Sequence, residues 1–254
     1  MLTAAIVLYH NDPVVLMEAV DSFLATPMRK ILYLIDNSNT NSLESYFQGR
    51  DEVVYIHTGK NVGFGAGHNH ILKDIASKSD YHLILNPDAY FDKEVIPLLV
   101  KQLKSDSQIG IIAPKILYAD GTFQHSIRRF PRVYDFLLRR VKFLGKLFKN
   151  AFDKINYLNG PIDRPLDVEA VSGCFQLFRT SVFLGVKGFD TRYFMYMEDL
   201  DICREVHKMG YKVLYYPDIS VFHRSEYASK KSMKLFRIHL QSIFRYFVKW
   251  GIKV

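Results

Sequence analysis

The chain has 254 residues, 48% hydrophobic and 24% charged, a balance that predicts a folded protein with a large core and excludes intrinsic disorder. Its two cysteines, Cys174 and Cys203, are far apart and form no CxxC or Cys/His pattern, which argues against a zinc site or a disulfide framework. The formal net charge of +8 indicates an acidic partner, either a phosphorylated ligand, a membrane surface or nucleic acid.

The first 116 residues alternate between predicted strands and helices at the spacing of βαβ units. Strands are expected at residues 4–9, 30–35, 53–57, 81–85 and 109–116, and helices at 13–24, 67–75 and 96–104. This order predicts a mostly parallel α/β sheet flanked by helices, in which ligands bind at the carboxyl ends of the strands.

Polar residues follow four of these strands. They are His10-Asn11-Asp12, Asp36-Asn37-Ser38, Asn61 and Asn86-Pro87-Asp88. A carboxylate at such a strand end, here Asp88, can bind Mg²⁺ or Mn²⁺, with His223 at the end of the last predicted strand as a further ligand. The alternatives are an ordinary Asn-Pro-Asp turn and a hydrogen-bonded structural histidine, and His10, His68 and His125 are weaker ligand candidates.

The glycine-rich segment at residues 61–69, NVGFGAGHN, follows a strand and opens a helix, as a dinucleotide-binding turn does. The GxGxxG spacing requires a glycine after Gly63 and Gly65 at position 68, where His68 stands. This disfavours a nicotinamide-dependent oxidoreductase, although the glycines still indicate a sharp bend or a close approach to the backbone.

Two basic amphipathic segments are expected, at residues 128–149 and 230–254. In the second, the predicted apolar side has Leu235, Phe236, Leu240, Ile243, Phe247 and Val248, and the cations are Lys234, Arg237, Arg245 and Lys249. Such helices are suited to anionic membrane surfaces, and the alternative is a solvated face over ordinary core contacts. No recognition module accompanies these charges, so nucleic acid is not an expected partner.

The segment MEDLDICREVHKMG at residues 197–210 predicts a short helix whose first turn carries three acids, Glu198, Asp199 and Asp201. Glu198 and Asp201 share a face, whereas Asp199 points about 100° away from Glu198. Apolar surroundings can raise a carboxylate pKa toward that of a general base. The simpler interpretation is that these acids complement the helix dipole and cap free N–H groups.

Taken in order, VLYHN, IDNS, NVGFGAGHN, LNPDAYF, SGCFQLFR, VKGFDTRYFMYMEDLDICREVHKMGYKVLYYP and VFH resemble the inverting family-2 glycosyltransferases, in particular the bacterial rhamnosyltransferase branch. The resemblance covers roughly residues 3–250. It implies the GT-A fold, an α/β architecture with a Rossmann-like, mostly parallel central sheet flanked by helices. We expect residues 1–116 to bind the nucleotide-sugar and 117–225 to hold the acceptor and the catalytic acid, with 226–254 forming the C-terminal amphipathic helix.

The resemblance also implies roles for individual residues. Asp36 would contact a pyrimidine base, and the nucleotide-sugar-binding set would also include Tyr9, Asn11, Asn61, Gly63, Asn69 and Asn86. Asp88 stands in the place of the family's DxD motif and would hold Mg²⁺ or Mn²⁺ with His223. Asp199 would be the catalytic base, with Glu198 beside it. Asn86 replaces the first acid of DxD, which puts strict metal dependence in question.

We therefore expect an inverting transferase that moves a sugar, most plausibly L-rhamnose from dTDP-rhamnose, to a lipid-linked glycan acceptor in bacterial surface polysaccharide (O-antigen or capsule) synthesis. The alternative is a noncatalytic nucleotide- or glycan-binding protein with the same fold. Residues 1–13 lack the basic region of a signal peptide, and no segment reaches about 18 apolar residues. We expect a cytoplasmic enzyme, peripheral on the inner face of the cell membrane.

Overall fold

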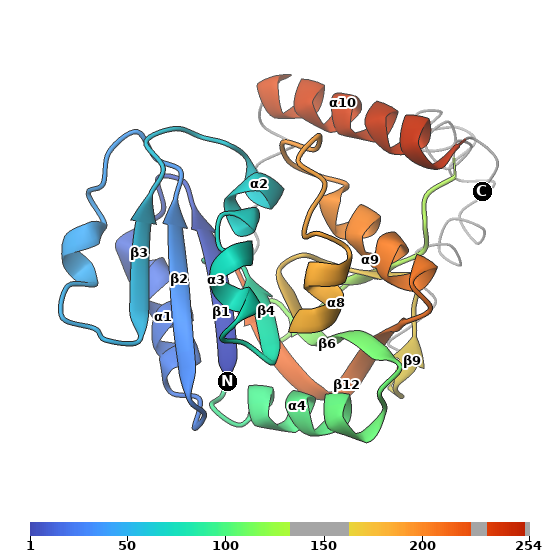
Figure 1. Cartoon of the computed structure of the whole chain (residues 1–254), viewed down its shortest axis with the longest axis horizontal. Coiled ribbons are helices and arrows are strands. Elements are labelled where there is room, and N and C mark those ends of the chain that lie inside the picture. Colours follow the sequence, from blue (N-terminus) through green and yellow to red (C-terminus); the bar gives the residue numbers. More distant parts are fainter. Residues whose placement is uncertain (133–162, 225–232, 252–254) are drawn as a thin grey trace.

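The chain folds around a curled mixed sheet with helices on both faces (Figure 1). The structure is a computed structural model that describes residues 1–132, 163–224 and 233–251, and within these ranges ten strands form the main sheet. The main path is β3-β2-β1-β4-β11-β6-β12-β5, with β7 paired to β6 and β9 to β12. Strands β10 and β8 form a separate small sheet.

The strands are β1 Leu2–Leu8, β2 Lys30–Asp36, β3 Val53–His57, β4 Tyr81–Leu85, β5 Ala89–Tyr90, β6 Ile109–Leu117, β7 Phe123–Gln124, β8 Ile127–Arg128, β9 Leu166–Asp167, β10 Ala170–Val171, β11 Phe175–Arg179 and β12 Lys212–His223. The helices are α1 Pro13–Leu24, α2 Phe64–Asn69, α3 Leu72–Ala76, α4 Val95–Ser105, α8 Thr180–Gly185, α9 Glu198–Lys208 and α10 Met233–Trp250, with a 3₁₀ turn at Glu44–Tyr46.

Alternation along the strands divides the core between the two faces of the sheet. In β1, Leu2, Ala4, Ile6 and Leu8 pack with the apolar sides of α1 and α4, whereas Ala5 faces the opposite cluster. That second cluster takes side chains from α3, α8, α9 and α10. Both faces are therefore covered, as the long apolar runs of the central strands require.

The predicted first half is confirmed with small changes at the element ends. Strands β1, β2, β3 and β4 are mutually parallel, and β3 and β4 have the predicted bounds. The expected helix at 67–75 is instead two short helices, α2 and α3.

The predicted boundary near residue 116 is not a break in the sheet. Strand β11, from the second half of the sequence, runs antiparallel between β4 and β6 of the first half. The division into a nucleotide-sugar half and an acceptor half stays a prediction about function. Most of the basic segment at 128–149 lies outside the described residues.

Helix α10 lies across α9 and the loop that precedes α9, at the upper edge of Figure 1. The predicted apolar side is divided between core and solvent: Ile243 and Phe247 pack on the core beside the fully buried Tyr246, whereas other members of the predicted set are exposed. Lys249 was expected to face headgroups, but it forms ion pairs with carboxylates of the protein. The outward apolar stripe consists of Met233, Phe236, Leu240, Phe244 and Val248.

None of the helices in the described ranges is long and apolar enough to cross a membrane.

Candidate active site

The loops after β1, β2 and β3 are joined at the carboxyl edge of the sheet. The register aligns Leu8 with Asp36 and Asp36 with His57, so the three loops begin side by side. The backbone N–H of His10 donates to Ser38 Oγ at 2.9 Å, and Asn11 accepts from the Tyr9 N–H at 2.8 Å. The structure thus brings Tyr9, Asn11 and Asp36 to one edge, as the sequence predicted.

The carboxylate of Asp36 is fully buried within this edge. Its Oδ1 accepts the Ser38 backbone N–H at 2.8 Å, and its Oδ2 accepts the hydroxyl of Tyr55 in β3. Burial and the bond to Asp36 raise the pKa of Tyr55, so the phenol keeps its proton and donates. Each oxygen of a carboxylate has a second lone pair, so Asp36 has acceptor capacity beyond these two bonds.

Asn61 and Gly63 belong to the next loop, where Asn61 Oδ1 accepts the Gly63 N–H at 3.0 Å. Gly63 has φ of 92°, and a Cβ there would lie 2.3 Å from the carbonyl oxygen of Phe194. The adjacent Phe64 N–H donates to that same oxygen at 3.0 Å. The glycine thus allows the loop before α9 to approach α2, and any contact of Gly63 with a nucleotide-sugar stays a prediction.

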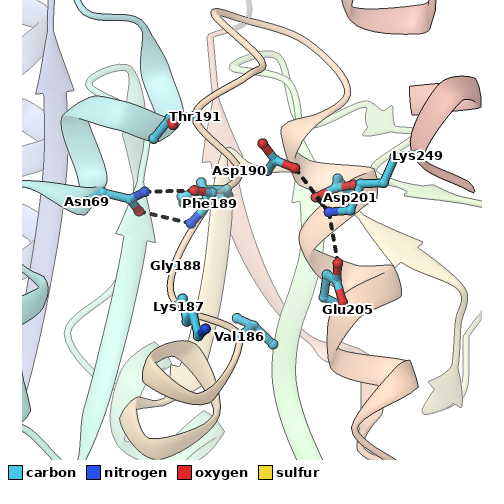
Figure 2. A pocket seen from close by; sticks show the side chains of 10 residues that line it. All are labelled: Asn69, Val186, Lys187, Gly188, Phe189, Asp190, Thr191, Asp201, Glu205 and Lys249. Carbon is cyan, nitrogen blue, oxygen red and sulfur yellow. Dashed lines mark hydrogen bonds and ion pairs between the residues drawn. The ribbon is translucent and has the colours of Figure 1, made fainter. Parts of the chain in front are cut away.

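Asn69, at the end of α2, binds the backbone of Phe189 with both the oxygen and the nitrogen of its side-chain amide. Its Oδ1 accepts the Phe189 N–H at 2.9 Å, and its Nδ2 donates to the Phe189 carbonyl at 2.7 Å. Figure 2 shows this pair beside a cavity of about 340 Å³ whose lining also includes Asp201, Glu205 and Lys249. The amide holds the loop before α9, and its predicted contact with the donor is not tested by this geometry.

The predicted metal ligands are brought together by the pairing of β5 with β12. His223 Nε2 lies 3.2 Å from Asp88 Oδ1 and 3.2 Å from the Asn86 amide nitrogen. On the other side of the ring, Nδ1 lies 3.1 Å from Gln124 Oε1 in β7. Gln124 orients the imidazole, and nothing in the sequence pattern singled it out.

The donor set fits a divalent cation. With the proton on Nδ1, where Gln124 accepts it, the Nε2 lone pair accepts the Asn86 amide N–H at 3.2 Å and lies 3.2 Å from Asp88 Oδ1, so a cation bound here would replace the Asn86 donor. Ligands bonded to Mg²⁺ or Mn²⁺ at about 2.1 Å in octahedral geometry stand about 3 Å apart. Within the described ranges no group of three His, Cys, Asp or Glu side chains gathers, so the remaining ligands would be amides, water and phosphate oxygens.

The acids of α9 follow a strained stretch of backbone. Tyr196 and Met197 have φ of 72° and 71°, which non-glycine residues rarely adopt, and the helix begins at Glu198 without a side-chain N-cap. Such conformations persist only where the surrounding structure enforces them, and they concentrate at functional sites. The first turn of α9 is therefore held in place by its neighbours.

The three acids of this turn have different environments. Glu198 is 7% exposed, and its Oε2 has no hydrogen-bond partner among the described residues. Burial together with the nearby Asp199 raises its pKa to about 8. Asp199 is partly exposed, and its Oδ2 lies 3.4 Å from the Gly173 N–H. Asp201 is 2% exposed and ion-paired with Lys249. The acids therefore cannot all serve merely as dipole-complementing surface charges.

The turn at residues 172–174 connects the two candidate centres. The Asn86 N–H donates to the Cys174 carbonyl at 2.9 Å, and Gly173 faces Asp199, whose Cβ would be 3.4 Å from a Cβ at Gly173. Burial is the main cause of the raised pKa of the Cys174 thiol, and the charges of Asp88 and Asp199 raise it further. The predicted metal ligand and the predicted base thus stand on either side of one tight turn.

A family model described as "Glycosyl transferase family 2" matches residues 4–183. The chain belongs to this family. It is 29% identical over 223 residues to the rhamnosyltransferase WbbL of Escherichia coli (strain K12), covering 84% of this chain and 80% of that one. It is 28% identical over 219 residues to the N-acetylglucosaminyl-diphospho-decaprenol L-rhamnosyltransferase of Mycobacterium tuberculosis (strain ATCC 25618 / H37Rv), covering 81% and 70%. The chain is a glycosyltransferase of the rhamnosyltransferase-like branch.

Solved structures agree with the fold. The chain superimposes on GalNAc-T7 with UDP, GalNAc and Mn²⁺ at a TM-score of 0.67 with 17% identity, over 88% of this chain and 43% of that one. Its likeness to the mannosyltransferase PcManGT from Pyrobaculum calidifontis, in complex with GDP-Man and Mn²⁺, has a TM-score of 0.62 with 16% identity, over 97% and 64%. The predicted GT-A fold class is confirmed.

Proposed function

We propose that this glycosyltransferase moves L-rhamnose from dTDP-rhamnose, with inversion, to a lipid-linked glycan acceptor in bacterial surface polysaccharide synthesis. The observation that carries the proposal is the grouping of Asp88 and His223 on one side of the turn at 172–174 with Asp199 on the other. A transferase needs charge neutralisation at the diphosphate and a base at the acceptor within one sugar's length. The two rhamnosyltransferase relatives support the choice of sugar, and the mycobacterial name supports a polyprenyl diphosphate-linked acceptor.

The pyrimidine ring of the donor nucleotide would lie at the carboxyl edge of β1 and β2. The buried Asp36 offers its remaining lone pairs to the ring N–H that thymine and uracil share, and the ring of Tyr9 is 53% exposed beside it. The ring N–H of guanine lies between a carbonyl and an amino group in a larger bicyclic base, not between two carbonyls, and adenine has no ring N–H on this edge. Titration calorimetry should therefore give tight binding of dTDP and UDP and weak binding of GDP, and equal affinities would contradict the assignment of Asp36.

Asp88 and His223 would hold Mg²⁺ or Mn²⁺, with Asn86 and Gln124 orienting them. When bound, the cation supplies neutralisation of the negative charge that develops on the leaving diphosphate. The protein's own part is to fix a carboxylate and an imidazole at the end of β4 and β12, where the pyrophosphate of a donor seated on β1 and β2 would reach.

Asp199 would take the proton from the acceptor hydroxyl. Because helical phase turns it away from Glu198 and Asp201, it faces the turn and remains partly exposed to an incoming glycan. Attack from the face opposite the diphosphate then inverts the anomeric carbon. Glu198, protonated up to about pH 8, would donate a hydrogen bond rather than accept a proton at neutral pH.

The deciding experiment compares wild type with Asp199→Asn, Glu198→Gln and the exposed control Asp51→Asn in a transfer assay that measures dTDP release. A general base contributes about 10²–10⁴-fold, so Asp199→Asn should lose that much in kcat and keep its donor affinity. An active Asp199→Asn beside an inactive Glu198→Gln would assign the base to Glu198. Donor binding without transfer or hydrolysis by the wild type would point to a noncatalytic binding protein.

The outer side of α10 would bring the enzyme to anionic lipid. Five large apolar side chains, from 42% to 76% exposed, form its outward stripe, and the exposed Lys234 and Arg237 flank it. Apolar side chains of such a helix enter the interface while each nearby cation adds about 1 kcal/mol at an anionic surface.

Co-sedimentation with phosphatidylglycerol vesicles tests this surface. The double variant Leu240→Glu, Phe244→Glu should lose binding, whereas Leu98→Glu, which changes a 46% exposed leucine of α4, should bind like wild type. Added salt should weaken the wild type, because it screens the headgroup attraction. Equal binding by all three proteins would refute the lipid role of α10.

A further inference from the structure

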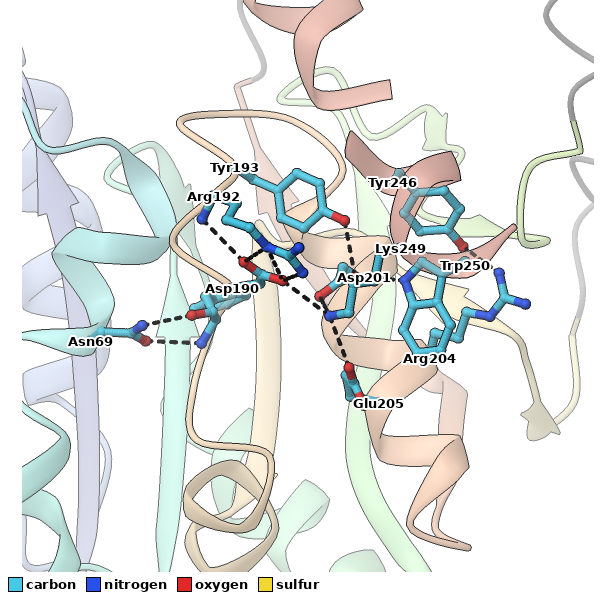
Figure 3. Close-up of polar contacts among 11 residues, drawn as sticks. Asn69, Asp190, Arg192, Tyr193, Asp201, Arg204, Glu205, Tyr246, Lys249 and Trp250 are labelled. Atoms are coloured by element: carbon cyan, nitrogen blue, oxygen red, sulfur yellow. Dashed lines mark hydrogen bonds and ion pairs between the residues drawn. The ribbon is translucent and has the colours of Figure 1, made fainter. Parts of the chain in front are cut away.

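The loop between α8 and α9 is held from two sides (Figure 3). On the α2 side, Asn69 binds the Phe189 backbone and the Phe64 N–H donates to the Phe194 carbonyl. On the α10 side, Ser242 Oγ donates to the Met195 carbonyl at 2.8 Å, and Arg245 donates to the Arg192 carbonyl. The strained residues before the catalytic acids therefore lie between two anchors.

Asp201 is the point where this loop, α9 and α10 meet. Its Oδ1 accepts the Tyr193 hydroxyl at 3.1 Å and the Trp250 indole N–H at 2.7 Å. Its Oδ2 accepts Lys249 Nζ at 2.7 Å. The carboxylate is 2% exposed and lies two residues after Asp199, in the first turn of the same helix.

Lys249 connects three carboxylates with one ammonium group. It lies 3.2 Å from Asp190 in the loop, 2.7 Å from Asp201 and 2.8 Å from Glu205 one turn further along α9. The ammonium is 17% exposed, and Arg192 provides a second cation at Asp190, at 2.6 Å. Charge-assisted bonds between partly buried groups are strong and directional, so the cluster restrains both the rotation and the depth of α9.

We propose that Lys249 and Trp250 are positioning residues for glycosyl transfer. Through Asp201 they set the first turn of α9 and the loop before it, and so aim the carboxylate of Asp199 at the acceptor hydroxyl. This inference rests on the proposed role of Asp199. It assigns to the inner side of α10 a catalytic task that is separate from lipid binding on the outer side.

The need for these positioning contacts follows from how α9 begins. Two left-handed residues precede it and no side chain caps it, so the backbone alone does not hold the first turn. Catalytic groups must stay within about 0.5 Å of productive geometry, and a displacement of about 1 Å can cost about 10²-fold in rate. Among the described residues, the predicted donor contacts at β1, β2 and β4 form no hydrogen bond with Asp201, Lys249 or Trp250, and of the predicted set Asn69 touches the loop from its α2 side, so donor affinity should change much less than kcat.

The test compares Lys249→Met, Lys249→Arg and Trp250→Phe with Lys208→Met, an exposed lysine of α9 that serves as a matched control. Transfer kinetics are measured with the donor varied, and donor affinity by calorimetry. Trp250 is the chain's single tryptophan, so its fluorescence reports directly on the contacts among Asp201, Lys249 and Trp250. We expect Lys249→Met to lose at least about tenfold in kcat with donor KM within about threefold, and its emission to shift to longer wavelength.

Lys249→Arg should recover much of that loss because it restores the cation, and Trp250→Phe, which keeps ring packing but removes one donor to Asp201, should lose a few-fold. A folded Lys249→Met with wild-type kcat overturns the inference. So does a loss of kcat that equals the loss in the number of donor-binding sites per molecule, because the variant would then only contain less folded enzyme. If Lys249→Met does not fold, Trp250→Phe decides alone, and unchanged kcat in it overturns the inference. Asp199→Asn in the same assay separates the two levels: if it stays active, the catalytic assignment itself fails.

Discussion

Replacing Glu198 by Gln should make the protein more stable at alkaline pH. The side chain is 7% exposed, and within the part of the chain that the structure describes its Oε2 has no hydrogen-bond partner. Burial and Asp199 raise its pKa from 4.5 to about 8. At pH 7 such a carboxyl is about 90% protonated in the folded protein and almost fully ionised in the unfolded chain. Glutamine has nearly the same shape and hydrogen-bonding capacity as the protonated acid, so the fold should accept it.

The sign and size follow from proton linkage. Between pH 4.5 and about 8 the folded state holds a proton on Glu198 that the unfolded state has released, so the free energy of unfolding falls as pH rises through this window. Each pH unit costs about 1.4 kcal/mol, which amounts to about 3 kcal/mol at pH 7 relative to pH 4.5. Glu198→Gln lacks this titration, so its advantage over wild type should grow from pH 5 to pH 8 and then level off.

Urea unfolding of both proteins at intervals from pH 5 to pH 9 measures this difference. The difference between variant and wild type isolates Glu198, because every other titrating group is common to both proteins. Asp199→Asn is an internal check: it removes a neighbour that raises the Glu198 pKa, so its loss of stability should level off at a lower pH than in the wild type. Parallel pH dependences for wild type and Glu198→Gln would refute the reasoning.

Three further predictions concern the neighbouring elements. Gly63→Ala should lower the free energy of unfolding by more than about 2 kcal/mol, because the added Cβ would collide with the Phe194 carbonyl and the backbone φ of 92° is strained for alanine. Chemical unfolding measures this, with Gly121→Ala as the control, because Gly121 also has a positive φ but has open space around it. His68 is fully buried, and burial holds its pKa well below 6.5, so the free energy of unfolding should fall as the pH drops below 6.5. In His68→Leu this fall should be smaller by about 1.4 kcal/mol per pH unit, and unfolding measured between pH 4 and 6.5 would show the difference. Asp88→Asn should remove the Mn²⁺-dependent part of dTDP binding without lowering the melting temperature, since its carboxylate meets only His223 among the ion pairs of the described residues; calorimetry with and without Mn²⁺ measures it.

Local pattern was sufficient to predict the sheet's first half. In β3 and β4 the apolar runs end at turn residues, and the strand bounds therefore agree with the structure. The pattern was insufficient where tertiary contacts decide. Residues 67–75 have a helical composition but form two helices, because Ile71 departs from helical backbone at φ of −102° and ψ of 8° before α3 begins.

The candidate site was predictable only in the residues that carry the chemistry. Asp88 and His223 stood out because a carboxylate and an imidazole at strand ends suggest ligation, and the resemblance selected Asp199 among the three acids of α9. Their supports did not stand out. Gln124 and Lys249 act on partners 99 and 48 residues away in the chain, and no local periodicity reports such pairings.

Helical phase explains how three acids within four residues come to have three environments. A rotation of about 100° per residue turns Glu198 and Asp201 inward and leaves Asp199 facing the turn at 172–174. Three ionised carboxylates this close would repel one another, and each would raise the pKa of the others. Protonation of Glu198 and the pairing of Asp201 with Lys249 remove two of the three charges. The carboxylate left without a buried or paired environment is then that of Asp199, the residue proposed above as the base.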